Sequence, residues 1–163
     1  MKHPNPHIIT VSKNKQEEIL HPETFCMDEL FDELYLYVKN ELQNKGKSDV
    51  KVEMFKYSDY EKCWVHTDRV RLRQIFCNLF DNAIKLTNTG YILFGFHTSV
   101  SNNMNFFVDD TGDSNFDDDC LELSIARGLV QQMGGNMEVR PTEVSGTSVN
   151  FNIECYPSEV HEN

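Results

Sequence analysis

The sequence predicts an α+β fold, a two-layer α/β sandwich in which a mixed sheet of about five strands carries three main helices on one face. Helices are expected at 26–45, 68–87 and about 119–133, and the first two repeat apolar residues at spacings of three and four. Short β-rich runs lie between and after the helices, without the strict alternation that a parallel sheet requires. These two observations together favour a mixed sheet with helices on one side.

The chain has 163 residues, 39% of them hydrophobic, which suffices for one domain with a proper core but not for a second. We expect an N-terminal arm or linker remnant at 1–21, the folded domain at 22–157 and a C-terminal tail at 158–163. No apolar run reaches the length of a membrane span, and the first residues lack the apolar segment of a signal peptide. The expected location is therefore cytoplasmic.

The net charge of -11 argues against nucleic acid and anionic membranes as partners, because each would require a basic face. The five cysteines are scattered and show no CxxC spacing, which predicts reduced thiols and no zinc site.

The first half of the predicted domain contains one helix and two strands. Gly46 ends the helix at 26–45, a strand follows at 50–55, and a turn at 57–62 leads to a short strand at 64–66. The apolar face of this helix consists of Met27, Leu30, Phe31, Leu34, Tyr35, Val38 and Leu42.

The central helix at 68–87 has Asp68 as its predicted N-cap and ends in a loop before Gly90. At roughly 100° per residue, its core-facing stripe contains Leu72, Ile75, Phe76, Leu79, Ala83 and Leu86. The neighbouring polar arc contains Arg71, Gln74, Asn78, Asn82 and Lys85. The two asparagines could simply border a core helix. Carboxamides one turn apart, followed by an ammonium group, would also suit a hydrated divalent cation and phosphate oxygens.

The second half begins with runs at 91–98 and 104–109, which predict a β-hairpin. Asp110-Thr111-Gly112 then places a carboxylate at a strand end, where the glycine allows the backbone to approach a ligand closely. Such a tripeptide is also common in turns. Gly134-Gly135 follows the third helix, which predicts a helix stop and not a phosphate loop, and strands at 137–140 and 148–155 complete the domain.

The segment Asn78-Leu-Phe-Asp-Asn82-Ala83-Ile-Lys85-Leu-Thr-x-x-Gly90 resembles the N box of sensor histidine kinases, a branch of the Bergerat (GHKL) ATPase fold shared with gyrase and the heat-shock chaperones. The resemblance extends from about Pro22 to Pro157. Within it, Val108-Asp-Asp110-Thr111-Gly112 is similar to the first glycine box, and 123–135 is similar to the helix and turn after the second. The resemblance implies an ATP-binding domain of two-component (phosphorelay) signalling.

The resemblance also implies how adenine would be recognised. Asp110 would accept a hydrogen bond from the exocyclic amine, Gly112 would leave room for the ring, and Thr147 would support this contact through the polar network of the site.

The cofactors implied are ATP and Mg²⁺. Asn82 would hold the metal, Asn78 would assist, and Lys85 would meet phosphate. The first position of the N box is Glu in the family's hydrolases and Asn in its kinases, so Asn78 favours the kinases.

The sequence departs from the family pattern where the triphosphate would bind. Ser114 replaces a second glycine, Leu121-Glu122-Leu123 stands where Gly-Leu-Gly-Leu is expected, and the lid between the two boxes is essentially absent. Carboxylates crowd the loop and would repel a triphosphate unless cations intervene; they belong to Asp109, Asp110, Asp113, Asp117, Asp118 and Asp119. The run 117–119 could instead cap the next helix, or form a calcium site without EF-hand spacing.

Two functions remain open. The first is a kinase domain of weak activity that presents the γ-phosphate of Mg-ATP to a dimerisation and phosphoacceptor His domain, or works with a response regulator. The second is a non-catalytic, degenerate kinase domain that docks a kinase, a phosphotransfer protein or a response regulator. In the family, the phosphoacceptor is a His followed by an acidic residue in a long helix. His3, His7 and His21 do not match it.

Overall fold

The computed structural model describes residues 19–58, 61–99, 103–113, 120–142 and 145–157. The predicted features at Ser114 and at 117–119, and all but the last residues of the predicted arm, lie outside these ranges. The elements in chain order are β1 (Glu23–Cys26), α2 (Met27–Asn44), β2 (Lys51–Tyr57), β3 (Trp64–Thr67), α3 (Arg69–Leu86), β4 (Tyr91–Thr98), β5 (Met104–Asp110), α4 (Leu121–Gln132), β6 (Met137–Pro141), β7 (Thr147–Ile153) and β8 (Tyr156–Pro157).

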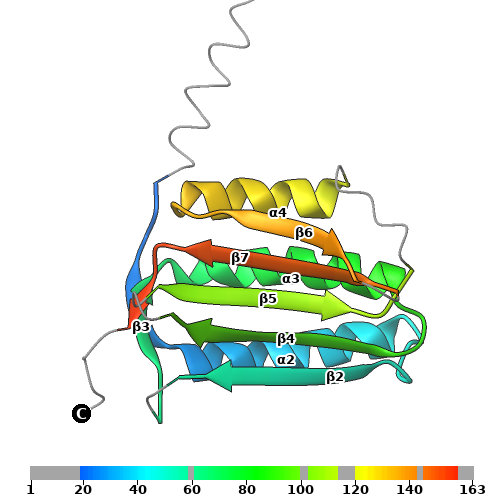
Figure 1. Ribbon diagram of the computed structural model, residues 1–163. Helices are drawn as coiled ribbons and strands as arrows, with labels where there is room; N and C mark the ends of the chain where they lie inside the picture. Colours follow the sequence, from blue (N-terminus) through cyan, green and yellow to red (C-terminus); the bar gives the residue numbers. More distant parts are fainter. Residues whose placement is uncertain (1–18, 59–60, 100–102, 114–119, 143–144, 158–163) are drawn as a thin grey trace, which may run out of the picture.

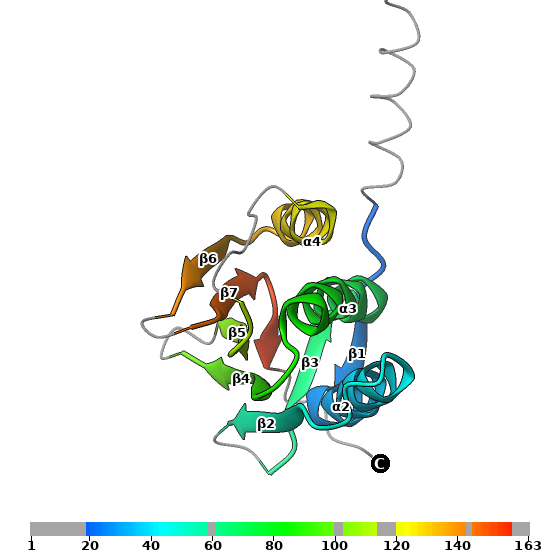
Figure 2. The same cartoon turned by 90° about the vertical axis from the view of Figure 1, so that its right-hand side faces the viewer.

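The main sheet has five strands in the order β2-β4-β5-β7-β6. β2 pairs with β4 in parallel, whereas the other three pairings are antiparallel, so the sheet is mixed. The helices α2, α3 and α4 all lie on one face of this sheet (Figures 1 and 2). The predicted fold class, a two-layer sandwich with a mixed sheet and helices on one side, is confirmed.

The central helix α3 begins as predicted. The Asp68 side chain accepts a hydrogen bond from the Arg71 backbone N–H at 3.0 Å, which satisfies one of the free donors of the first turn. The predicted stripe is too narrow, because Phe80 and Ile84 are also fully buried and Leu86 is only half-buried. The reason is that α3 lies between α2 and α4, so neighbouring helices bury its flanks as well as the side that faces the sheet (Figure 2).

Aromatic rings fill the space between the helices and the sheet. Phe31 of α2 lies 5.2 Å from Phe76 of α3, and Phe76 lies 5.4 Å from Phe151 of β7. Such packing between elements far apart in sequence contributes more than area burial alone, by about 0.5–1.5 kcal/mol per aromatic pair. The core therefore ties both ends of the domain to α3.

A second, smaller sheet has the order β1-β3-β8, all antiparallel. The short strand predicted at 64–66 is β3 of this second sheet, whereas β1 and β8 were not predicted, since they have 4 and 2 residues and no periodicity to detect. The backbone N–H of His21, just before β1, donates to the Asp68 carboxylate at 2.9 Å and ties this edge to the start of α3. Within the described residues, no helix is long and apolar enough to cross a membrane.

Candidate functional site

The candidate site is built around the carboxyl-terminal end of β5. Side chains of β5 alternate between the two faces of the sheet, and the buried set on the helical face ends at Asp110, which is 4% exposed. Its Oδ1 accepts a hydrogen bond from the Gly112 backbone N–H at 2.9 Å, and the Thr147 backbone also hydrogen-bonds the carboxyl. Burial raises the pKa of Asp110 to about 6, although these two backbone donors oppose the shift.

Two glycines bring the backbone close around Asp110. A side chain at Gly112 would overlap the carbonyl oxygen of Leu86 at the end of α3, so only glycine allows this contact. Gly146 has a φ of 114°, and a side chain there would overlap the Asp110 carbonyl oxygen. The strand end, the end of α3 and the start of β7 therefore meet at one point.

Two buried hydroxyl groups at this point have no hydrogen-bond partner among the described residues. Thr147 and Thr87 are both 0% exposed, and their Oγ1 atoms are unsatisfied. Thr87 is the C-cap residue of α3, and its Oγ1 lies 2.8 Å from the position that a Cβ at Gly112 would take. Buried polar groups are normally paired, so unpaired ones beside a buried carboxylate indicate a place for a ligand or ordered water.

The two asparagines of α3 have different environments. Asn82 is 4% exposed, and its Oδ1 accepts from the Cys120 Sγ at 3.5 Å, just before α4. Asn78 is half-buried, and its Nδ2 donates to the Gln74 carbonyl of its own helix at 2.9 Å. Among the described residues, the side-chain carbonyl oxygen of Asn82 therefore has only a weak thiol donor, which a metal ion could displace.

Lys85 forms an ion pair with Glu122 of α4 at 2.6 Å. The pair borders a hollow of about 480 Å³ that contains equal numbers of ammonium and carboxylate groups, from Glu41, Lys45, Lys47, Asp81, Lys85 and Glu122. Lys47 also donates to the Ile84 carbonyl at 2.6 Å. Because the described charges in this hollow balance, it offers an incoming anion no excess of positive charge.

Five of the six predicted site residues thus fall into two groups, while the side chain of Asn78 bonds its own helix. Asp110, Gly112 and Thr147 come together at the end of β5, whereas Asn82 and Lys85 lie on α3 and face the beginning of α4. The sequence analysis did not identify Thr87, because a helix-ending threonine carries no pattern that marks it as buried.

A comparison with models of protein families identifies the family of this chain. Residues 67–157 match the family model described as histidine kinase-, DNA gyrase B-, and HSP90-like ATPase. The chain belongs to this ATPase family. The matched region extends from just before α3 to β8 and includes every residue of the two groups described above.

Solved structures with this ATPase fold include histidine kinases. Histidine kinase AdeS from Acinetobacter baumannii has a TM-score of 0.70 at 20% identity, over 86% of this chain and 70% of that chain. The catalytic domain of histidine kinase ThkA gives 0.70 at 23%, over 85% and 100%. Full-length ShkA in complex with AMPPNP gives 0.73 at 22%, over 87% of this chain but only 33% of that one. The fold is therefore that of histidine kinase catalytic domains.

The described residues of this ATPase domain can be compared with the two ends of a nucleotide. The buried carboxylate of Asp110, the glycine beside it and the unpaired hydroxyls suit a ring with an amine donor. On the phosphate side, Lys85 is already paired with Glu122, and Asn82 contributes one carbonyl oxygen.

Proposed function

We propose that this chain is the nucleotide-binding domain of a two-component signalling protein, which binds Mg-ATP through its adenine and holds the triphosphate weakly. The observation that carries the proposal is the buried Asp110 carboxylate at the end of β5, with the unpaired Thr147 hydroxyl beside it. Asp110 would accept a hydrogen bond from the adenine amine, Thr147 would complete the polar network, and Gly112 would keep space free for the ring.

On the phosphate side, Asn82 would supply an oxygen to magnesium and Lys85 would meet a phosphate, with Asn78 as an auxiliary group. When bound, magnesium would neutralise part of the charge that develops on the transferred phosphoryl group. The protein's own contribution is to position and orient the nucleotide, since no side chain of the described site is arranged as a covalent nucleophile. The phosphoryl group would pass to a His on a dimerisation and phosphoacceptor domain.

Two comparisons support the setting of this proposal. The ShkA structure is a complex with AMPPNP. A ThkA structure is a complex with the response regulator TrrA, and the match covers 91% of this chain and 47% of that chain at 23% identity. We propose that this chain likewise binds an adenine nucleotide and has a response regulator as its partner. We also propose a cytoplasmic location.

The Lys85–Glu122 ion pair favours a second function. The family's glycine-rich segment is expected where Glu122 stands, and a carboxylate there both repels phosphate and occupies the ammonium that should bind it. A domain that had lost ATP use could remain as a docking module for a kinase, a phosphotransfer protein or a response regulator.

Calorimetric titration with adenosine, ADP and ATP, each with and without magnesium, separates the two functions. We expect adenosine to bind and ATP with magnesium to bind at most a few-fold more tightly, because the adenine contact dominates. A complete lack of binding by all three would contradict the nucleotide function and favour the docking module. Affinity that rises steeply from adenosine to ATP would show that the triphosphate is held strongly.

A further inference from the structure

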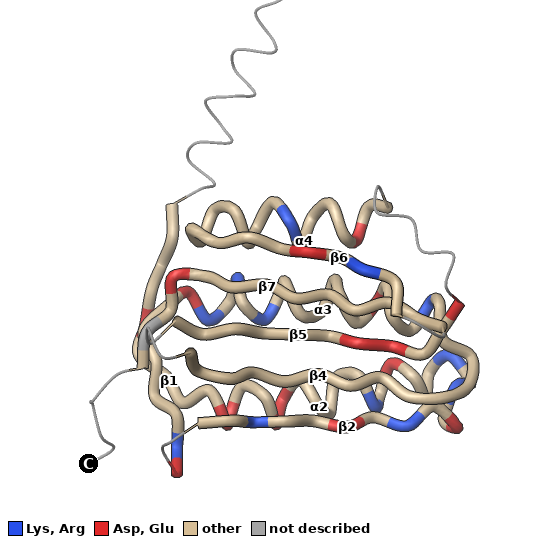
Figure 3. Tube along the Cα trace, in the orientation of Figure 1, with Lys and Arg blue, Asp and Glu red and all other residues tan. Residues whose placement is uncertain are grey.

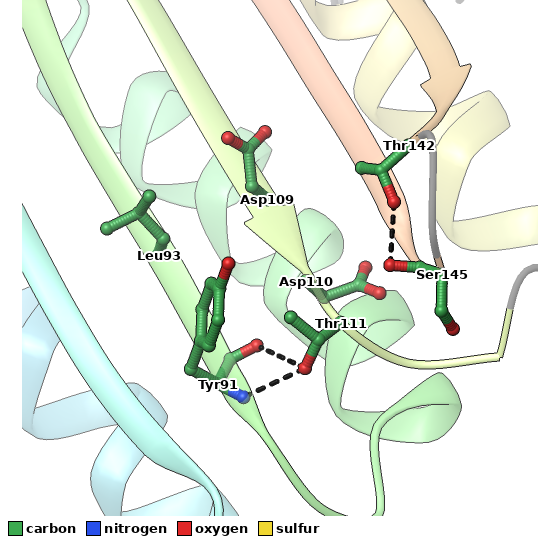
Figure 4. Close-up of a pocket in the computed structure, with 7 residues that line it drawn as sticks. All are labelled: Tyr91, Leu93, Asp109, Asp110, Thr111, Thr142 and Ser145. Carbon is green, nitrogen blue, oxygen red and sulfur yellow. Dashed lines mark hydrogen bonds between the residues drawn. The ribbon is translucent and has the colours of Figure 1, made fainter.

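A hollow of about 420 Å³ lies at one end of the sheet, between the open face and the residues Thr142 and Ser145 (Figure 4). Its lining residues are Tyr91, Leu93, Asp109, Asp110, Thr111, Thr142 and Ser145. The alternation along β5 that turns Asp110 toward the helices turns Asp109 the other way, where it lies opposite Leu93 of β4 and Ser148 of β7. Asp109 therefore faces the side of the sheet opposite the candidate adenine site, although Asp110 also lines the hollow.

The hollow contains a carboxylate oxygen that lacks a hydrogen bond. Asp109 Oδ1 is inaccessible to solvent and has no partner within the described part of the chain. The Asp109 carboxyl interacts with the Ser148 hydroxyl, and burial raises its pKa. A buried carboxylate oxygen without a donor is costly, by about 1–3 kcal/mol or more for a charged group. Asp109 as a whole is only half-buried, so a ligand that donates hydrogen bonds would contact the exposed part of the carboxyl group.

The threonine and serine hydroxyls that line the hollow already donate their protons to backbone carbonyl groups. Thr111 Oγ1 donates to the Tyr91 carbonyl at 3.4 Å and accepts from the Tyr91 N–H at 2.9 Å. Thr142 Oγ1 donates to the Ser145 carbonyl, and Ser145 Oγ donates to the Gly112 carbonyl, both at 2.6 Å. Among the described side chains that line the hollow, Tyr91 has the remaining hydroxyl, which can donate as well as accept. Apart from Tyr91, the described lining offers acceptors, and this favours ligands rich in N–H donors.

The walls of the hollow favour a flat cation. The Tyr91 side chain is 44% exposed and stands beside Leu93 with its hydroxyl directed toward Asp109 (Figure 4). A guanidinium group can stack on an aromatic face while its N–H groups reach a carboxylate, whereas an ammonium cannot do both with the same geometry. An aliphatic stem would contact Leu93.

We propose that this hollow binds an arginine side chain presented by a partner protein. Charge complementarity supports this occupant, because a chain with a net charge of -11 attracts basic partners. The position supports it as well, since none of the three described helices covers this face of the sheet, so a protein surface can approach it (Figures 2 and 3). The site goes beyond the proposed nucleotide function and does not depend on it.

Heteronuclear NMR titration of the full chain with the capped peptide acetyl-Gly-Arg-Gly-amide tests the proposal. We expect saturable shifts of the backbone signals of Tyr91, Leu93 and Asp109. The same peptide with citrulline in place of arginine, which keeps the shape and removes the charge, should bind at least roughly tenfold more weakly, as expected for losing a charge-assisted pair. Equal binding of the two peptides would overturn the proposal.

Two variants locate the effect. Asp109→Asn keeps the size of the side chain and should weaken arginine-peptide binding roughly tenfold, and Tyr91→Leu should weaken it less, by about threefold to tenfold. Asp32→Asn is the matched control, because it removes the same charge from an exposed position on α2, where Asp32 pairs with Lys56. The dispersion of each variant's spectrum shows that it is folded. Unchanged binding by Asp109→Asn, or an equal loss in Asp32→Asn, would contradict a specific site.

Free arginine distinguishes the source of the guanidinium group. A site for a partner protein should bind the capped peptide more tightly than the free amino acid, whose own carboxylate is repelled by Asp109. If free arginine binds as tightly as the peptide, the hollow is a small-molecule site and the assignment to a protein partner is wrong.

Discussion

At the scale of single residues, the environment of Asp110 sets how nucleotide binding should respond to mutation. A hydrogen bond to a buried charged group is worth about 1.5–3 kcal/mol. We therefore expect Asp110→Asn to reduce adenosine and ATP affinity roughly tenfold or more. Lys85→Ala should matter less, because the ammonium is already paired with Glu122 at 2.6 Å.

Calorimetry on both variants checks this order, with Asp32→Asn as the control for loss of one charge. If Lys85→Ala abolishes ATP binding while Asp110→Asn leaves it intact, the adenine-led model is wrong. In that case the phosphates would provide most of the binding energy.

The raised pKa of Asp110 makes stability depend on pH. Its pKa moves from 3.8 to about 6, so between these values the folded protein holds a proton that the unfolded chain has lost. This stabilising contribution is present below about pH 4 and is lost as the pH rises to about 6. A shift of this size corresponds to at most on the order of 2–3 kcal/mol.

Urea unfolding of the wild type and of Asp110→Asn at pH 4 and pH 7 measures this contribution. We expect the free energy of unfolding of the wild type to fall, relative to that of the variant, between the two values. Adenosine affinity should change in the opposite direction and strengthen through pH 6, because the ionised carboxylate is the better acceptor for the adenine amine. A pH-independent difference between the two proteins would show that Asp110 keeps an ordinary pKa.

Glu122 offers a test of the phosphate side. Its carboxylate occupies the Lys85 ammonium and adds negative charge beside the expected triphosphate position. Glu122→Gln should therefore strengthen ATP binding several-fold and leave adenosine binding unchanged, because removing one like charge acts only on the charged ligand. The ratio of the two affinities, measured at low ionic strength, is the readout. An equal change for adenosine would mean that Glu122 acts on the fold and not on phosphate.

At the scale of elements, α3 determines the stability of the domain. Leu79 is 1% exposed, on a helix that packs against α2, α4 and the sheet (Figure 2). Leu79→Ala removes buried methyl groups and leaves a cavity, so it should reduce the free energy of unfolding by about 2–5 kcal/mol. Chemical denaturation measures this loss. A loss below about half a kcal/mol would show that this position is not part of the core.

The long elements could be predicted from the sequence because their signals are local. The N-cap at Asp68 and the spacing of apolar residues in α2 and α3 report directly on the helix face that is buried. β1 and β8 could not be predicted, since strands of 4 and 2 residues depend on tertiary pairing with β3. Burial of Phe80 and Ile84 likewise depends on where the neighbouring helices lie.

In the candidate site, too, the features with local sequence signals could be predicted, and those that depend on tertiary packing could not. Sequence order placed Asp110 at a strand end, and the structure has it there. Asn82 lies on the predicted helix but is buried beside Cys120, which the polar arc of a single helix could not indicate. The Lys85–Glu122 pair joins residues 37 positions apart, and no spacing in the sequence indicates it. Likewise, the unpaired oxygen of Asp109 becomes visible only when β4 and β7 lie on either side of it.

At the scale of the whole molecule, the end of β5 contributes carboxylate side chains to both faces of the sheet. Asp110 faces the helices and the candidate adenine site, and Asp109 faces the hollow on the open side. The charge of Asp109 contributes to the raised pKa of Asp110, so the two faces are coupled electrostatically. A cation bound at Asp109 would favour the ionised form of Asp110.

The last prediction concerns phosphoryl transfer by the chain on its own. We expect no self-labelling on histidine in the presence of ATP and magnesium. His3, His7, His21, His66 and His97 are not followed by an acidic residue as the family's phosphoacceptor is, and His161, which precedes Glu162, lies outside the described residues. Among the exposed histidines that the structure describes, His66 shares a hydrogen bond with Thr24 at 2.9 Å and His97 lies on the open face of β4. The proposed nucleotide site is on the opposite, helical face of the sheet from His97, and phosphoryl transfer requires donor and acceptor atoms within contact distance.

The measurement is incubation of the chain with radiolabelled ATP, followed by acid and alkali treatment of the product. Phosphohistidine is labile to acid and stable to alkali, so the two treatments identify it. Addition of a phosphoacceptor domain from a histidine kinase is the positive control. We expect weak labelling of that domain by the wild-type chain and none by Asp110→Asn. Phosphate on His66 or His97 of the isolated chain would contradict the prediction, because it would require a transfer route that the separation of the two faces does not provide.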